Sequence, residues 1–323
     1  MTLLKRLAPL LFLAAMTLLA LGVGRYGAHF SDLFGPATDP GTVVLWRIRL
    51  PRVAAGLLVG AALAAAGASY QGLFRNPLVS PDILGVTAGA SLGAVLGIFF
   101  SLPVWAIQAL AFGGGIGAVA LVYAVGSLVK ARDPALVLVL AGVAVGAFIG
   151  ALVSLLKVLA DPYNQLPAIT YWLLGSLSAV TVGDVVSVLP AMVLGLIPLI
   201  ALRWRMNVMS LEDEEARALG VNTRLLRGVF LASATLLTAA AVSITGVIGW
   251  VGLLIPHVAR MLVGPDFRRL LPAALMLGGG YLVGVDMLAR SLGAMEIPLG
   301  VLTAAIGAPY FLYLLATAQR GWR

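Results

Sequence analysis

The sequence predicts an all-α integral membrane protein with about ten transmembrane helices, folded as a single domain over residues 1–323. Of the 323 residues, 61% are hydrophobic and only 11% are charged, whereas about 25% of the residues of a typical soluble domain are charged. Apolar runs long enough to cross a bilayer recur along the chain. The chain has no cysteine, which excludes disulfides, thiolate metal sites and cysteine nucleophiles.

The uncharged runs define the predicted membrane helices in chain order. A spanning helix needs about twenty mostly apolar residues, because the hydrocarbon core is about 30 Å thick. The runs are Leu7–Gly24, Val53–Phe74, Ile83–Val129, Pro134–Leu156, Val185–Leu202, Gly228–Ala259, Leu270–Val285 and Ile297–Gln319. The first run could be a secretory leader, but the apolar segments that follow it favour a membrane anchor.

Two of the runs are too long for one helix. Ile83–Val129 is about twice the length of a span, and Pro103 near its middle predicts a turn between two helices. Gly228–Ala259 contains several glycines and a proline, which favour a full helix to about Val247 followed by a short, broken helix over about Gly252–Val263. These divisions give ten helices.

Two further segments are predicted not to span. Pro167–Val180 follows a polar turn, and an acidic helix is expected in the longest cytoplasmic loop, residues 203–227. Ser210 can cap this acidic helix, whose last turn carries Arg217 and which ends at Gly220. A helix of about nine residues is marginal alone in water, so we expect a docking partner. An ordinary solvated loop helix is the alternative.

The distribution of basic residues predicts the orientation. Ten helices place both termini on one side, and that side then holds fifteen of the twenty-one Lys and Arg residues. The positive-inside rule therefore predicts cytoplasmic N and C termini. It does not explain the cluster of Arg47, Arg49 and Arg52 on the outer side. The formal net charge of +8 is read as membrane topology, and we expect no nucleic-acid partner.

The chain offers few groups for catalysis. His29 and His257 are its only histidines, and it has no zinc-protease, nucleophile-turn or phosphate-loop motif. We expect no enzyme activity and no metal site, and any ATP must be hydrolysed by a separate protein. Asp286 and Arg290 share one helix face and are predicted to form an ion pair near the outer end. A proton relay is the sharper alternative for this pair.

Several separated motifs carry a resemblance to a known family, from about Leu45 to the C terminus. They match in order and spacing, which makes them more specific together than any one alone. They are Arg49-Leu-Pro-Arg52, Gln71-Gly-Leu-Phe-Arg-Asn76-Pro77-Leu78, Ala216-Arg-Ala-Leu-Gly220, Gly246-Val-Ile-Gly-Trp-Val-Gly252 with Pro256-His257-Val-Ala-Arg260, Asp286-Met-Leu-Ala-Arg290, and Glu296-Ile-Pro298-Leu-Gly300. The chain thus resembles the permease subunits of the iron-siderophore, haem and cobalamin ABC importers.

The resemblance implies an architecture and a set of partners. Such a type II ABC importer permease has ten helices per subunit, with helices 2–5 and 7–10 as inverted repeats. It works as a homodimer in the lipid of the bacterial inner membrane, with two cytoplasmic ATPase subunits and a periplasmic substrate-binding protein. ATP and magnesium bind the ATPase, so no cofactor is expected on this subunit. The expected substrate is an iron chelate (siderophore or haem) or cobalamin, and an oxyanion such as molybdate is not distinguished.

The resemblance also implies roles for individual residues. Three arginines are expected to dock the binding protein: Arg49, Arg52 and Arg290. The ATPase coupling segment comprises Glu212, Asp213, Glu214, Glu215, Ala216, Arg217, Leu219 and Gly220. The cytoplasmic gate comprises Asn76, Leu78, Asp133 and Pro134. The alternative function is an ion-gradient-driven secondary transporter, which would need acidic groups at the bilayer midplane, and the broken element Gly246–Pro256 carries none.

Overall fold

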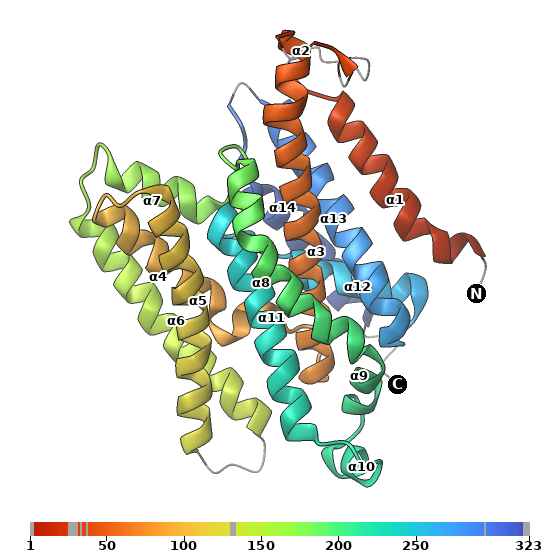
Figure 1. Cartoon of the computed structure of the whole chain (residues 1–323). Helices are drawn as coiled ribbons and strands as arrows, with labels where there is room; N and C mark the ends of the chain where they lie inside the picture. The colour runs from red at the N-terminus through yellow and green to blue at the C-terminus, as the bar shows by residue number, and fades with distance from the viewer. Residues whose placement is uncertain are drawn as a thin grey trace.

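A computed structural model describes residues 3–24, 32, 34–36, 38–129, 134–293 and 295–318. Within these ranges the chain is helical (Figure 1). The helices are α1 (Leu3–Gly22), α2 (Pro40–Val43), α3 (Leu50–Leu73), α4 (Val86–Phe99), α5 (Val104–Leu128), α6 (Pro134–Leu159), α7 (Gln165–Leu174), α8 (Val182–Ala201), α9 (Arg203–Met209), α10 (Asp213–Ala218), α11 (Thr223–Thr245), α12 (Val251–Val263), α13 (Phe267–Ser291) and α14 (Leu299–Ala318). A π-helical turn, η2 (Val44–Arg49), leads into α3, and a 3₁₀ turn, η3 (Pro81–Leu84), precedes α4.

Each of the ten predicted membrane segments is a helix. Six helices among the described residues are long and apolar enough to cross a membrane, and four shorter apolar helices complete the set. The segment expected not to span forms α7, which has ten residues. The uncharged run that ends at Val285 forms most of α13, which continues to Ser291 and so includes Asp286 and Arg290 on the same helix, as predicted. Both of these charged side chains are paired inside the protein.

The two halves of the chain repeat. The lengths of α3 to α6 are 24, 14, 25 and 26 residues, and those of α11 to α14 are 23, 13, 25 and 20 residues. The halves also interlock, since α3 packs on α12 and α13 while α11 packs on α4 and α5. The predicted repeat requires these reciprocal contacts. If α3 is equivalent to α11, then its partners α12 and α13 are equivalent to α4 and α5, the partners of α11.

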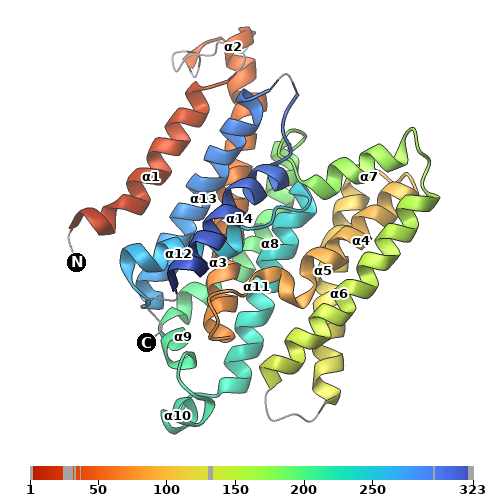
Figure 2. The ribbon, with the colours of Figure 1, turned by 180° about the vertical axis from the view of Figure 1, so that it is seen from behind.

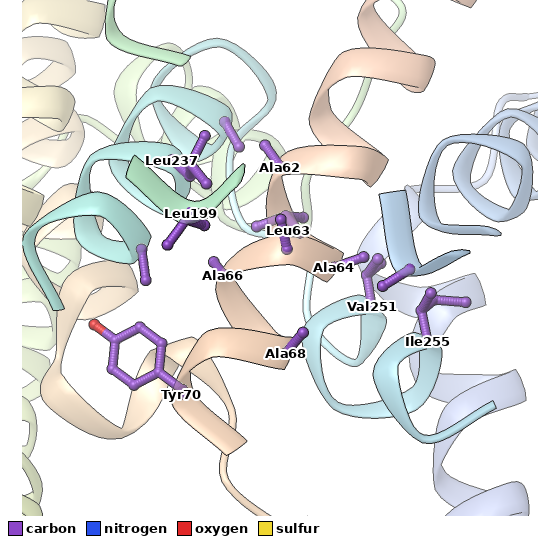
Figure 3. Packing of buried hydrophobic residues seen from close by; sticks show 14 of the residues in the cluster. Ala62, Leu63, Ala64, Ala66, Ala68, Tyr70, Leu199, Leu237, Val251 and Ile255 are labelled. Atoms are coloured by element: carbon purple, nitrogen blue, oxygen red, sulfur yellow. The ribbon is translucent and has the colours of Figure 1, made fainter. Parts of the chain in front are cut away.

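Helix α3 lies at the centre of the bundle. Ala64, Ala66 and Ala68 have no exposed surface, and Figure 3 shows their side chains among residues of α8, α11 and α12. Small residues allow this close approach. In lipid, close packing drives the association of helices, because the hydrophobic effect contributes little between helices where no water is present. At Gly60 even a Cβ atom would collide with the carbonyl oxygen of Gly278 on α13.

The peripheral helices surround this centre unevenly. Helix α1 lies at the edge of the bundle and packs mainly on α13, with α14 lying next to α12 and α13 (Figure 2). Helices α4, α5 and α6 form a group on the opposite side, capped by α7.

The predicted site residues that the structure describes lie at two opposite ends of the bundle. The arginine end contains η2, the C-terminal end of α1 and the connection between α13 and α14. The loop end contains the turn at residues 74–80, α9 and α10 (Figure 1).

Candidate functional sites at the two ends of the bundle

The arginine end brings together residues that are far apart in sequence. Arg49 ends η2, Arg52 lies in the first turn of α3, and Arg290 lies in the last turn of α13. Their exposed fractions are only 3%, 7% and 8%, so all three guanidinium groups are buried. Buried charges need paired and hydrogen-bonded partners.

Arg52 is bound by two carboxylates. Its Nε donates to Asp286 Oδ1 at 2.8 Å and to Oδ2 at 3.0 Å. Its Nη1 and Nη2 donate to Glu296 Oε1 and Oε2, both at 2.9 Å. The second pair is the bidentate geometry in which arginine binds carboxylates most strongly. Arg52 therefore joins α3 to α13 and to the connection that precedes α14.

The predicted Asp286–Arg290 pair is present but is not the main contact of either residue. Arg290 Nε lies 3.6 Å from Asp286 Oδ2, which is longer than the bonds from Arg52. The stronger contact of Arg290 is from Nη2 to the carbonyl oxygen of Ala20 at 2.6 Å. The sequence predicted neither carboxylate contact of Arg52, although Glu296 lies in a recognised motif.

The same arginines hold the C-terminal end of α1. Arg49 Nη1 donates to the carbonyl oxygens of Leu21 at 2.7 Å and Gly22 at 3.3 Å, next to the Ala20 oxygen bound by Arg290. The last carbonyls of a helix have no intrahelical partner, and cations near them are favourable. Two arginines thus anchor α1 to the bundle at its C-terminal end.

The resemblance implied that these three arginines dock a binding protein. In the structure they lie together, and they are buried and bonded to acceptors within this chain. The most exposed charged group of the cluster is Glu296, with 32% of its side chain accessible. Within this cluster, Glu296 is therefore the charged group that solvent reaches most easily.

At the loop end, α10 forms the predicted acidic helix with one difference. Ser210 does not cap it: the Ser210 hydroxyl donates to the carbonyl of Asn207 at 2.6 Å and ends α9. The N-cap is Glu212, whose backbone N–H donates to the Glu215 carboxylate at 3.3 Å. The helix therefore starts at Asp213 and has six residues, because α9 uses Ser210 for its own end.

The end of α10 is as predicted. Gly220 has φ of +77° and donates to Arg217 O at 2.9 Å, while Val221 donates to Ala216 O at 3.2 Å. These are the two bonds of a Schellman motif, which needs a left-handed residue at this position. Ala216 is buried, but Glu212, Glu214, Glu215, Arg217 and Leu219 are exposed. Leu219 is 63% exposed, so α10 presents a mixed acidic and apolar face.

A reciprocal polar contact connects α9 to α13. Asn207 Nδ2 donates to Asp266 Oδ1 at 2.7 Å, and the backbone N–H of Phe267 donates to Asn207 Oδ1 at 2.8 Å. The hydrogen bond from Asn207 lowers the pKa of the Asp266 carboxyl, and the backbone N–H of Arg268 adds to this effect. Sequence analysis missed this contact, which joins the segment before α10 to a long membrane helix.

The predicted gate residues lie at the same end. Asn76 Oδ1 accepts from Leu78 N at 2.9 Å within a tight turn, and Leu78 is 51% exposed. Asn76 lines a cavity of about 360 Å³ together with residues of α9 and α13. Pro134 begins α6. Asp133 lies outside the described residues.

A partly buried polar contact connects the C-terminal end of α3 to the broken helix α12. Arg260 Nη2 donates to Gln71 Oε1 at 3.0 Å, and Gln71 Nε2 donates to Leu253 O at 3.1 Å. Both side chains lie in motifs quoted above, but their mutual contact is visible only in the folded chain. Among the described residues, no group of three His, Cys, Asp or Glu side chains could hold a metal ion.

Comparisons with known proteins agree with this architecture. The molybdate import permease of Haemophilus influenzae is 40% identical over 320 residues, which cover 96% of this chain and 95% of that protein. The cobalamin import permease of Halobacterium salinarum is 44% identical over 89% of this chain and 77% of that protein. A solved inward-facing structure, assigned to the metal-chelate type of ABC transporter, has 39% identity and a TM-score of 0.88, with 96% of this chain and 98% of that chain covered.

The family comparison covers almost the whole chain. The profile of the FecCD transport family matches residues 10–317, a range that includes the arginine cluster, α10 and the turn at residues 74–80. The chain therefore belongs to the FecCD transport family and is a multi-pass permease of an ABC importer.

Proposed function

We propose that this permease carries a metal chelate, namely an iron siderophore, haem or cobalamin, from the periplasm to the cytoplasm across the bacterial inner membrane. It does so as a homodimer with cytoplasmic termini, together with two ATPase subunits and a periplasmic binding protein. The relatives named above, for molybdate and cobalamin, leave the substrate open. The solved metal-chelate transporter, which covers nearly the entire chain, favours a chelate.

The single observation that carries the proposal is the short helix α10, which is well formed although most of its side chains are exposed. A six-residue helix gains little stability by itself in water, yet α10 has a capped start, a Schellman end and a buried Ala216 anchor. Its exposed acidic and apolar face suits the surface of a soluble ATPase. ATP and magnesium would bind that ATPase, and we propose no cofactor for this chain.

Movement of the ATPase would reach the membrane helices through α9. The Asn207–Asp266 contact joins α9 to the start of α13, and the cavity beside it is lined by Asn76. A displaced α9 would therefore move α13 and the turn that holds Leu78. The Arg260–Gln71 contact would pass the same motion between α3 and α12.

At the arginine end, glutamates of the binding protein would dock through Arg49, Arg52 and Arg290. The buried position of these arginines means that an arriving carboxylate must exchange with Glu296 for Arg52. Arg49→Glu combined with Arg290→Glu should weaken docking. Because both arginines also hold the C-terminal end of α1, basal ATP turnover of the variant is measured as the control for its folded state. Arg47, which is exposed in η2, gives the matched control Arg47→Glu. Equal docking by the double variant and the control would remove this role.

The function is tested by ATP hydrolysis of the reconstituted complex. The purified permease, its ATPase and its binding protein are assembled in liposomes, and turnover is measured with ferric siderophores, haem, cobalamin and molybdate. We expect one chelate class to stimulate hydrolysis. Stimulation by molybdate alone, or equal rates across all four, would contradict the chelate proposal.

A further inference from the structure

A groove on the membrane face of α5, α8 and α11 is not used by any role described above. It is a cavity of about 680 Å³, within the range of about 300–1,000 Å³ that small-molecule sites occupy. Its walls are almost entirely apolar, with Ile116 and Val119 from α5, Leu194 and Pro198 from α8, and Val229 and Ala232 from α11. It lies on the half of these helices that is nearer the loop end.

The groove lies between α5 and α8, which make few contacts with each other. One of these is near the arginine end, where Gln108 Nε2 donates to Asp184 Oδ1 at 2.7 Å. In the other half of the protein, α1 packs closely on α13, the helix equivalent to α5. No such helix fills the space between α5 and α8 among the described residues.

The groove continues into a cationic mouth. Tyr123 and Gly228 line the apolar groove and also a neighbouring cavity of about 300 Å³ at the loop end. That second cavity is lined by Arg217, Arg224 and Arg227. No acidic residue lines either cavity within the described part of the chain. One continuous surface thus has an apolar half at membrane depth and a triply basic half at the membrane boundary.

We infer that this surface binds an anionic phospholipid. The acyl chain would lie in the groove between α5, α8 and α11, and the headgroup phosphate would meet the arginines. Basic pockets between membrane helices at the cytoplasmic boundary suit anionic headgroups, and arginine pairs with phosphate in bidentate geometry. Tyr123, 47% exposed, has the amphipathic ring that favours the interface between chain and headgroup.

The first test measures lipid retention by the full-length protein in detergent. Native mass spectrometry compares bound dioleoyl-phosphatidylglycerol with dioleoyl-phosphatidylcholine. Arg224→Gln with Arg227→Gln should reduce the preference for phosphatidylglycerol by about 30-fold, since each basic residue near the surface contributes roughly fivefold. Arg268→Gln with Arg269→Gln removes the same charge from exposed residues at the same end and should leave the preference unchanged. Equal loss in both variants would overturn the inference, since a general surface charge would then explain binding.

The apolar half is tested separately. A Cβ atom at Gly228 has no neighbour within 4 Å, so Gly228→Leu can fill the groove and should reduce retention of both lipids. sn-Glycerol 3-phosphate, which has the phosphate without acyl chains, should neither displace the lipid nor raise the melting temperature. An equal shift with this compound would show a soluble phosphate site and refute a lipid site.

A final measurement needs no variant. Phosphatidylglycerol with a photoreactive acyl chain should label wild-type peptides that contain residues 116–123 and 228–236. Labelling confined to other helices, with none in these two segments, would overturn the proposal even if a variant failed to fold.

Discussion

The buried position of Arg52 allows a quantitative test of the arginine end. Replacing it in Arg52→Met removes the partner that binds Asp286 at 2.8 Å and Glu296 at 2.9 Å. The cationic neighbour that then remains for Asp286 is Arg290, whose Nε lies 3.6 Å from Asp286 Oδ2. The side chain of Asp286 is 3% exposed, so water cannot replace the lost partner.

The two carboxylates should contribute unequally to the loss. A charge pair separated by about 4 Å interacts with about 4 kcal/mol at an effective dielectric constant near 20. Removing one member of a buried pair costs about 3–5 kcal/mol, because the other charge stays buried. The Glu296 side chain is 32% exposed, and such solvent access reduces its share to about 1 kcal/mol. We expect Arg52→Met to lower the free energy of unfolding by about 3–5 kcal/mol.

A double-mutant cycle with Asp286→Asn identifies the source of this loss. The double variant has no unpaired carboxylate at residue 286, so its loss should fall short of the sum of the single losses by about 1.5–3 kcal/mol. Unfolding is followed by far-ultraviolet circular dichroism during titration of mixed micelles with dodecyl sulfate. Arg47→Met, at an exposed position, should change stability by at most about 0.5 kcal/mol. A loss below about 1 kcal/mol for Arg52→Met, or strict additivity in the cycle, would refute the reasoning.

Three further predictions concern backbone packing and the loop end. Gly60→Ala places a Cβ against a carbonyl of α13 and should lower the free energy of unfolding by about 1–3 kcal/mol in the same assay. The control Gly113→Ala meets open space and should be neutral or stabilise the fold by up to about 1 kcal/mol. Equal effects of the two variants would contradict the packing argument. Gly220→Val puts a β-branched residue at φ of +77°, which should destabilise the end of α10 by about 1–2 kcal/mol. The variant should bind the ATPase more weakly in a pull-down. Unchanged binding would exclude α10 from that contact. Because Asn207 lowers the pKa of folded Asp266 below 3.8, the carboxylate stabilises the fold above that pH and this contribution disappears as the pH falls through the lowered pKa. The difference in melting temperature between wild type and Asp266→Ala should therefore shrink below about pH 3.8, and a constant difference would show that ionisation is irrelevant.

Some features were predictable from the sequence because they depend on local or periodic properties. The uncharged runs predicted all ten membrane helices, since each span must be apolar over about the thickness of the bilayer. Pro103 and the glycines from Gly246 to Gly252 marked the divisions within the two long runs. Gly220 marked the end of α10, because few residues other than glycine adopt a left-handed conformation at low cost.

Predictions failed where a side chain could choose between neighbours. Ser210 was expected to cap α10, but its hydroxyl satisfies α9, and only the path of the folded chain shows which helix end is closer. Asp286 was expected to pair with Arg290 on its own helix. In the structure its carboxylate is bound by Arg52, 234 positions away in sequence, and no local pattern indicates that partner.

By itself the sequence determined that the chain crosses a membrane many times, which segments form the membrane helices, and which family the chain resembles. Composition, periodicity and motif spacing are properties of the chain alone. Only the tertiary structure decided that Arg49 and Arg290 hold the end of α1, that Arg52 is bound by Glu296, and that α5 and α8 leave a groove with a basic mouth. These outcomes depend on which side chains meet across helices distant in sequence. A buried charge is stable only with the partner that the fold brings to it, and no local pattern specifies that partner.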